Sequence, residues 1–314
     1  MPLKPEIIEF LKRRAAANLP EVYNAPISVI RANTQNHPIL SAKLPSIYSV
    51  QHKNIPGPTA DLPVRIYRGS ESTESSENPV LVYFHGGGWA TNHLDTYEFA
   101  LRNISNIGQI TIIAVQYQKA PEHPFPVPFD DCFATLKWVF QNAKSLNINP
   151  NKIGVGGDSA GGNLAAAVAL KNRDTKLGNL AFQLLIYPCL NFEMNFESAK
   201  KFAVGFNLDT EAMRWYWNTY LPNPADRKNP LAVPALAKDF RNLPPAIILT
   251  AENDPLVDDG KNFAQLLKSA DIPVIYKDYP GQIHGFFNLA TVTDDAIKLH
   301  EDCANLINQV MNSR

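Results

Sequence analysis

The stretch GVGGDSAGGN, residues 154–163, places Ser159 among five glycines. An apolar approach beginning at Ile153 precedes it and an alanine- and leucine-rich segment follows, which predicts a strand, a tight turn and a helix. Glycine weakens regular structure, so its density here indicates a need for positive φ angles or for close backbone approach. Two kinds of turn have that need: one that cradles a phosphate and one that presents a nucleophile.

The phosphate-binding interpretation fails at defined positions. A G-x-G-x-x-G fingerprint starting at Gly154 needs a glycine where Ser159 stands, and no acidic residue lies at 178–180, the expected ribose position. A P-loop would need Gly-Lys-Ser/Thr where the chain has Gly-Gly-Asn. By contrast, GDSAG at 157–161 satisfies the G-x-S-x-G pattern of a nucleophile elbow at every position. A glycine-rich turn with an incidental serine is the structural alternative.

A second glycine cluster, HGGGW at residues 85–89, directly follows an apolar run at 80–84. Successive glycines leave their backbone N–H groups bare, so a ligand can approach them closely. Together with the N–H of Ala160, just after the serine, they supply the donors that an oxyanion hole needs. A flexible loop is the structural alternative, but no other linker-like residues follow the motif.

A serine nucleophile needs a base, and the base needs an orienting acid. Of the seven histidines, His284 and His300 are the two that fit the chain order of serine, acid and histidine. His284 lies in the loop GQIHGFF after the last predicted strand, whereas His300 falls in the C-terminal helix, where a surface position is expected. His284 is therefore the predicted base.

The predicted acid is Asp254, which follows the apolar run AIILTA at 246–251. Ligands bind at the carboxyl ends of strands in sheets of this kind, and Asp254 stands at such an end. An aspartate before a proline also suits a helix N-cap, and one residue can do both jobs. Asp258 and Asp259 lie a turn into the next predicted helix and are weaker candidates.

Apolar runs alternate with helical stretches along the chain, a pattern typical of an α/β fold with a mostly parallel sheet covered on both faces. Two amphipathic runs, 47–55 and 64–67, predict edge strands at an antiparallel front of the sheet. The inner strands are predicted at 80–84, 111–117, 152–157, 182–187, 246–251 and 273–279. Helices are predicted at 129–146, 160–170 and 291–311.

Composition narrows the class of function. A formal net charge of −1 over 314 residues gives no electrostatic footprint for nucleic acid or an anionic membrane. The N-terminal stretch has charges throughout, so it predicts neither a signal peptide nor a membrane span. The three cysteines, without CxxC spacing, are expected to be buried and reduced, and a cytoplasmic location is the default. No cofactor and no metal are expected.

Four motifs in order, HGGGW, GDSAGG, DPLVDDG and HGFF, resemble the hormone-sensitive-lipase-like branch of α/β-hydrolase carboxylesterases. The resemblance covers nearly the whole chain and implies Ser159 as nucleophile, Asp254 as acid and His284 as base. It also implies that Gly87 and Gly88 join Ala160 as oxyanion donors. The chain departs from the family's YRLAPE-type segment, because Gln118 and Lys119 replace the usual residues there, which leaves a salt bridge in question.

The resemblance implies a division of the chain into a catalytic core and a helical cap. The cap is expected from residues 1–45, with one amphipathic helix, and from the insert at 191–233 after the sixth strand; the core is expected from 46–190 and 234–314. Aromatic residues of the insert and of HGGGW are candidates for the substrate pocket, and for those of the insert core packing is the alternative role. These candidates are Trp89, Phe206, Trp215 and Trp217.

The expected activity is hydrolysis of short- to medium-chain acyl esters by a monomer or homodimer, with a small-molecule ester as the only partner. Two other functions stay open at this point. An amide or arylformamide hydrolase would use the same triad. A ligand receptor on the same fold would bind without hydrolysis, although such a receptor typically lacks one of the three triad residues, all of which are present here.

Overall fold

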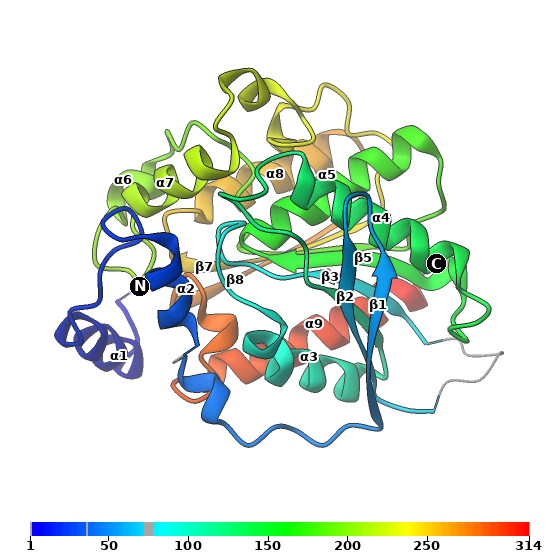
Figure 1. Cartoon of the computed structure of the whole chain (residues 1–314), viewed down its shortest axis with the longest axis horizontal. Coiled ribbons are helices and arrows are strands. Elements are labelled where there is room, and N and C mark those ends of the chain that lie inside the picture. Colours follow the sequence, from blue (N-terminus) through cyan, green and yellow to red (C-terminus); the bar gives the residue numbers. More distant parts are fainter. Residues whose placement is uncertain (1, 36, 72–77, 314) are drawn as a thin grey trace.

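The computed structural model describes residues 2–35, 37–71 and 78–313. Among these residues, an eight-stranded sheet runs in the order β1-β2-β4-β3-β5-β6-β7-β8 (Figure 1). β2 pairs antiparallel with β1 and with β4, and all other neighbours are parallel. The strands are β1 Ser49–Pro56, β2 Asp61–Arg68, β3 Val80–Phe84, β4 Thr111–Val115, β5 Ile153–Asp158, β6 Gln183–Ile186, β7 Ala246–Asn253 and β8 Val274–Ile283.

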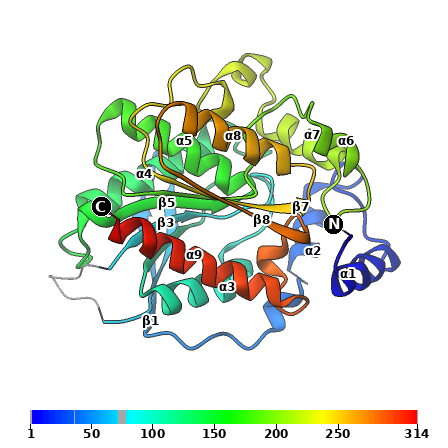
Figure 2. The same cartoon turned by 180° about the vertical axis from the view of Figure 1, so that it is seen from behind.

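Helices cover both faces of the sheet (Figure 1 and Figure 2). α3 and α9 lie on one face, and α4, α5 and α8 lie on the other. The described α-helices are α1 Pro5–Ala16, α2 Ile27–Thr34, α3 Leu94–Gly108, α4 Val127–Gln141, α5 Ala160–Thr175, α6 Glu197–Lys201, α7 Thr210–Tyr220, α8 Val257–Ser269 and α9 Asp294–Asn312. Short 3-10 turns are η1 Pro38–Ser41, η2 Pro150–Lys152, η3 Pro224–Lys228, η4 Pro234–Leu236 and η5 Phe286–Asn288.

The period of two along each strand divides the core into two layers. In β3, Val80, Val82 and Phe84 belong to the core under α4 and α5. Leu81 and Tyr83 belong to the core under α3 and α9. All five side chains are buried, because a sheet covered by helices on both faces leaves neither face to water.

The predicted α/β fold, its eight strands and its antiparallel front are confirmed. The three helices predicted with bounds correspond to α4, α5 and α9, with ends that differ by up to five residues, and the helices expected near the N-terminus and after Asp254 correspond to α1 and α8. Two helices were missed: α2, within what was expected to be an irregular stretch, and α3, after HGGGW. α3 does carry a helical pattern, since Tyr97, Leu101 and Ile104 are buried at a spacing of three to four residues.

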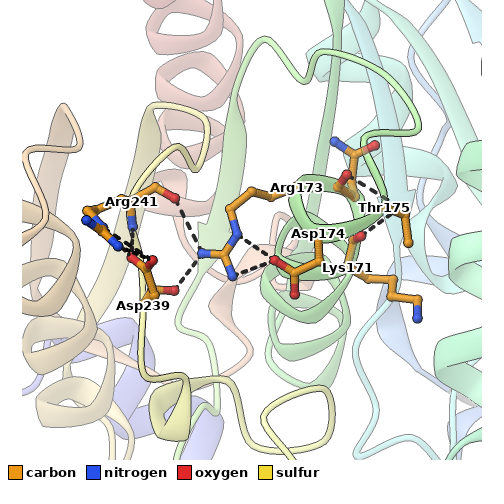
Figure 3. Close-up of polar contacts among 7 residues, drawn as sticks. Lys171, Arg173, Asp174, Thr175, Asp239 and Arg241 are labelled. Atoms are coloured by element: carbon orange, nitrogen blue, oxygen red, sulfur yellow. Dashed lines mark hydrogen bonds and ion pairs between the residues drawn. The ribbon is translucent and has the colours of Figure 1, made fainter.

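The helix that begins at the elbow is tied at its far end to the chain leading into β7 (Figure 3). The Arg173 guanidinium donates to the Asp239 carbonyl at 2.5 Å and to the Asp174 carboxylate at 2.8 Å. Arg241 pairs with the Asp239 side chain at 2.8 Å. These contacts lie on the surface, so they fix the C-terminal turn of α5 more than they stabilise the fold.

The three cysteines are free and buried, as expected. Within the described ranges, no helix is long and apolar enough to span a membrane.

In the segment that departs from the family pattern, Gln118 contacts a buried carboxylate. The Asp131 carboxylate in α4 is fully buried and accepts from the Gln118 N–H at 2.8 Å and from its side-chain amide at 3.3 Å. Burial raises the pKa of Asp131, because these amide donors only partly replace water.

We expect Gln118→Arg to raise the free energy of unfolding by about 1 kcal/mol, because a guanidinium would give this buried carboxylate a charged hydrogen-bond partner. Urea denaturation at pH 7.5 measures the change. Gln118→Met is the matched control: it keeps the side-chain length, removes the amide, and should lower stability. Equal or reversed stabilities of the two variants would contradict the assigned role of Gln118.

Candidate active site

The glycines around Ser159 allow an approach that no other residue would permit. A Cβ on Gly157 would lie 2.3 Å from the Phe84 carbonyl oxygen, and a Cβ on Gly161 would lie 1.9 Å from the same atom. Ser159 itself has φ 54° and ψ −120°, a region that costs a non-glycine residue about 1–3 kcal/mol. Its N–H donates to the Ile186 carbonyl at 2.8 Å, which holds the strained turn against β6.

Three side chains from separate loops meet at this turn. His284 Nδ1 lies 2.7 Å from Asp254 Oδ2, and His284 Nε2 lies 2.9 Å from Ser159 Oγ. A carboxylate only accepts, so Nδ1 carries the proton and Nε2 is left to accept from the serine hydroxyl. Ser159 is 6% exposed, His284 8% and Asp254 0%, so the chain of hydrogen bonds is largely shielded from water.

Asp254 serves two purposes through its two oxygens. Oδ2 faces His284, while Oδ1 accepts from the Leu256 N–H at 2.8 Å. The helix starts later than the sequence suggested, with Leu256 at the N-cap of α8, so Asp254 stabilises the turn before the helix and is not its N-cap.

The two neighbouring aspartates of α8 do not reach His284. Asp258 accepts from the Ser198 N–H at 2.9 Å, and Asp259 accepts from the Leu190 N–H at 2.6 Å. The Asp259 contact holds the chain where it leaves β6 for the insert, and the Asp258 contact holds α6 within the insert. Burial raises the pKa of Asp259 to about 7, and the backbone N–H donors offset that rise in part.

The HGGGW loop follows β3 and faces the elbow. Gly87 and Gly88 have φ angles of 113° and 57°, which only glycine adopts without strain. Within the part of the chain that the structure describes, neither of their N–H groups donates to a protein acceptor. The Ala160 N–H is the first of α5, where helix N–H groups have no intrahelical acceptor and favour an anion.

Asp158 joins the elbow to this loop, a function that the sequence analysis missed. Its Oδ1 accepts from the Gly86 N–H and from the Tyr83 hydroxyl, both at 2.8 Å, and its Oδ2 accepts from the Tyr97 hydroxyl at 3.1 Å. Burial raises the pKa of Asp158 to about 6, despite these three donors. Asp158 occupies a variable position of G-x-S-x-G, so the pattern itself carries no signal for it.

Two of the predicted pocket aromatics lie in a buried cluster between the loop and α7. Trp89 is 0% exposed and stacks on Tyr220 with 4.3 Å between ring centroids. The Trp217 ring is tilted against Trp89, with 4.5 Å between their ring centroids. Trp217 therefore has the packing role that was the alternative for the insert aromatics. Trp89, which joins core and insert, has the same role.

The other two aromatics are partly exposed. Phe206 packs edge-on against Phe202 at 5.0 Å, and Trp215 contacts Tyr216 at 5.3 Å. Tyr216, which was not among the candidates, lies against Gly88 of the HGGGW loop. A Cβ on Gly88 would come within 2.1 Å of its ring, so α7 places an aromatic side chain directly on the HGGGW loop.

His300 lies at a buried position, so the expected surface position is wrong. Its side chain is 0% exposed, Nε2 donates to the Phe287 carbonyl at 2.9 Å, and burial lowers its pKa to about 4. α9 turns this face toward α3, a contact that helical spacing alone does not reveal. No group of three or more His, Cys, Asp or Glu residues suited to a metal ion occurs among the described residues.

Asp158 makes the stability of the protein depend on pH. Its raised pKa means that the folded state holds a proton which the unfolded chain releases, so this contribution is full below about pH 4 and is lost as pH rises through about 6. Relative to Asp158→Asn, which cannot ionise, the wild type should lose on the order of 1 kcal/mol between pH 5 and pH 7.5. Urea denaturation at both pH values measures this difference; a constant difference contradicts the prediction.

The chain matches known proteins over most of its length. A family model described as the alpha/beta hydrolase fold matches residues 81–288. A carboxylesterase of Mycobacterium tuberculosis, NlhH, is 38% identical over 239 residues, which is 75% of this chain and 74% of that protein. An arylesterase of Saccharolobus solfataricus is 34% identical over 289 residues, 91% of this chain and 92% of that protein.

A solved structure has the same architecture from end to end. An ester hydrolase from the metagenome of Lake Arreo, in complex with a derivative of bipyridine phosphonate, superimposes with a TM-score of 0.93. It is 35% identical in sequence, and the match covers 99% of each chain. The chain therefore belongs to the α/β-hydrolase fold family, in the hormone-sensitive-lipase-like branch of carboxylesterases.

Proposed function

We propose that this protein is a serine hydrolase of carboxylic esters. The observation that carries the proposal is the continuous hydrogen-bond chain from Asp254 through His284 to Ser159 Oγ. The names of its relatives, carboxylesterase and arylesterase, support the same class of substrate. Each of the three residues has a defined part in the reaction.

In the first half-reaction, His284 Nε2 takes the proton of Ser159 Oγ as that oxygen attacks the ester carbonyl carbon. The protonated imidazole then donates the proton to the oxygen of the leaving alcohol, and the C–O ester bond breaks. In the second half, His284 takes a proton from water, whose oxygen attacks the acyl-serine ester. The acid leaves and Ser159 regains its proton. Asp254 holds the imidazole in the required tautomer throughout.

The tetrahedral oxyanion would be bound by the N–H groups of Gly87, Gly88 and Ala160. Neither glycine N–H has a protein acceptor, and the elbow holds the Ala160 N–H beside Ser159. A donor of this kind contributes about 3 kcal/mol to transition-state binding. Because these donors are backbone groups held by packing, they need no reorganisation during the reaction.

We propose that residues 1–45 and 191–233 form a cap over the core formed by 46–190 and 234–314. In Figure 1 and Figure 2, α1 and α2 lie at the same end of the molecule as α6 and α7. Asn163 supports these boundaries because its amide donates to the carbonyls of Cys189 and Ala232, both at 3.0 Å, where the insert leaves and rejoins the core. The small exposure of Ser159 and the Tyr216 ring against Gly88 favour short- to medium-chain acyl groups.

An amide or arylformamide hydrolase on the same triad is the second candidate, since the first steps are identical until the leaving group departs. A receptor without activity is disfavoured by the intact hydrogen-bond chain. The three free, buried cysteines are consistent with a cytoplasmic location. A monomeric or homodimeric state stays part of the proposal.

We expect Ser159→Ala to abolish ester hydrolysis while leaving the fold intact, because it removes the attacking oxygen and no core contact. A serine-directed phosphonate should label wild-type protein on Ser159, as located by peptide mass, and should leave the variant unlabelled. p-Nitrophenyl esters of increasing acyl length give the substrate profile. Wild-type turnover in Ser159→Ala would refute the mechanism, and labelling without ester turnover would favour amides.

We expect Asp254→Asn to lower kcat by about 10⁴-fold, because an amide at this position allows the wrong tautomer of His284. Asp258→Asn is the matched control in the same turn and should leave kcat within about threefold, since Asp258 contacts the insert and not His284. Steady-state kinetics on one ester decide the matter. The reverse ranking of the two variants would reassign the acid.

A further inference from the structure

The insert contacts the predicted base at an atom that the reaction does not use. The Asn207 side-chain amide donates through Nδ2 to the main-chain carbonyl of His284 at 2.9 Å. Asn207 lies between α6 and α7, and 77 positions separate it from His284 in the chain. This contact links the insert to the catalytic histidine rather than to a pocket wall.

A charged group on the N-terminal segment fixes which way the Asn207 amide points. Arg14, in the last turn of α1, donates from Nη1 to Asn207 Oδ1. A guanidinium can only donate, so it selects the carbonyl oxygen of the amide and turns the NH₂ group toward His284. The backbone of Asn207 has φ 75°, a left-handed conformation that asparagine tolerates better than most residues.

The loop that carries His284 is restrained by the Asn207 side chain, which comes from outside the loop. His284 follows directly after the end of β8 and precedes Gly285, whose φ is 82°. Glycine restricts the peptide unit between the two residues less than another residue would, and this unit includes the Cα atom that carries the imidazole. Asn207 Nδ2 sits where it limits that rotation, only 3.3 Å from where a Cβ on Gly285 would lie.

The N-terminal segment also touches the opposite side of the site. Arg31 of α2 donates to the carbonyls of Ala90 and Ala120, at 2.8 and 2.9 Å, and pairs with Glu122 at 2.7 Å. Ala90 directly follows HGGGW. The segment therefore contacts the oxyanion loop through one arginine and the histidine loop, via Asn207, through another.

We propose that Asn207 is a positioning residue for His284 and that Arg14 orients it, so that the first helix of the chain controls the alignment of the general base. The proposal rests on the esterase function proposed above, in which His284 is the base. Loss of this hydrogen bond should lower the rate of the chemical steps and leave substrate binding nearly unchanged, because Asn207 bonds to the main chain of the histidine and not to the reacting atoms.

The decisive variant is Asn207→Asp. It retains an oxygen for Arg14 and tolerates the left-handed backbone, but it replaces the donated hydrogen with an oxygen facing the His284 carbonyl. We expect kcat on a p-nitrophenyl ester to fall about ten- to a hundredfold, with KM changed less than about twofold. Asn207→Gly, which also accepts φ 75°, should show a loss of the same kind. Arg14→Ala should show a smaller loss, and Arg14→Lys should restore most of it.

Asn242→Asp is the matched control, because Asn242 also has a left-handed backbone, with φ 60°, and is exposed on the segment before β7. It should keep wild-type kinetics. A second readout is the downfield proton resonance of the His284 Nδ1–H shared with Asp254, which should shift or broaden in Asn207→Asp alone.

Three results separate the possible failures. Wild-type kcat in both Asn207 variants, with Ser159→Ala inactive, overturns the positioning role and leaves the esterase proposal standing. Activity losses that follow the unfolded fraction measured by urea denaturation, with an unchanged Nδ1–H resonance, also overturn it. Turnover in Ser159→Ala overturns the esterase proposal itself.

Discussion

The close approach of the elbow to the end of β3 is the constraint on which the site depends. The Phe84 carbonyl oxygen lies 2.3 Å from where a Cβ on Gly157 would be and 1.9 Å from where one on Gly161 would be, so both positions are restricted to glycine. That approach places the first turn of α5 beside the HGGGW loop, and Asp158 then joins the two through the Gly86 N–H. The proposed nucleophile and the proposed oxyanion donors are thereby held by packing rather than by flexible side chains.

Buried carboxylates make the polar connections of this framework, and each is an acceptor for backbone N–H groups. Asp158 joins the elbow to the HGGGW loop. Asp254 joins the turn before α8 to His284, and Asp259 joins the same helix to the start of the insert. Desolvation raises the pKa values of Asp158 and Asp259, because backbone donors replace water only in part. The geometry of the site is thus obtained at the expense of some stability near neutral pH.

The N-terminal segment and the insert contact the proposed site directly, in addition to covering it. Tyr216 of α7 lies on Gly88, Asn207 donates to the His284 carbonyl, and Arg31 of α2 donates to the carbonyl after HGGGW. A movement of these segments would change the alignment of the reacting groups as well as access to them. These few contacts connect the proposed cap to the proposed triad and oxyanion donors.

The sequence by itself determined the features that short windows encode: the period-two strands, the elbow at Ser159, the glycine loop, and the order in which acid and base follow. The strands, the elbow and the glycine loop depend on steric limits within a few residues of chain, whereas the order of acid and base follows from the sequence of motifs along the chain. Only the tertiary structure decided which distant side chains meet. It placed His300 in the core, turned Trp89 and Trp217 into packing residues, and brought Tyr97 to Asp158 and Asn207 to His284. Those contacts depend on how helices pack across the two faces of the sheet, and no local pattern records that packing.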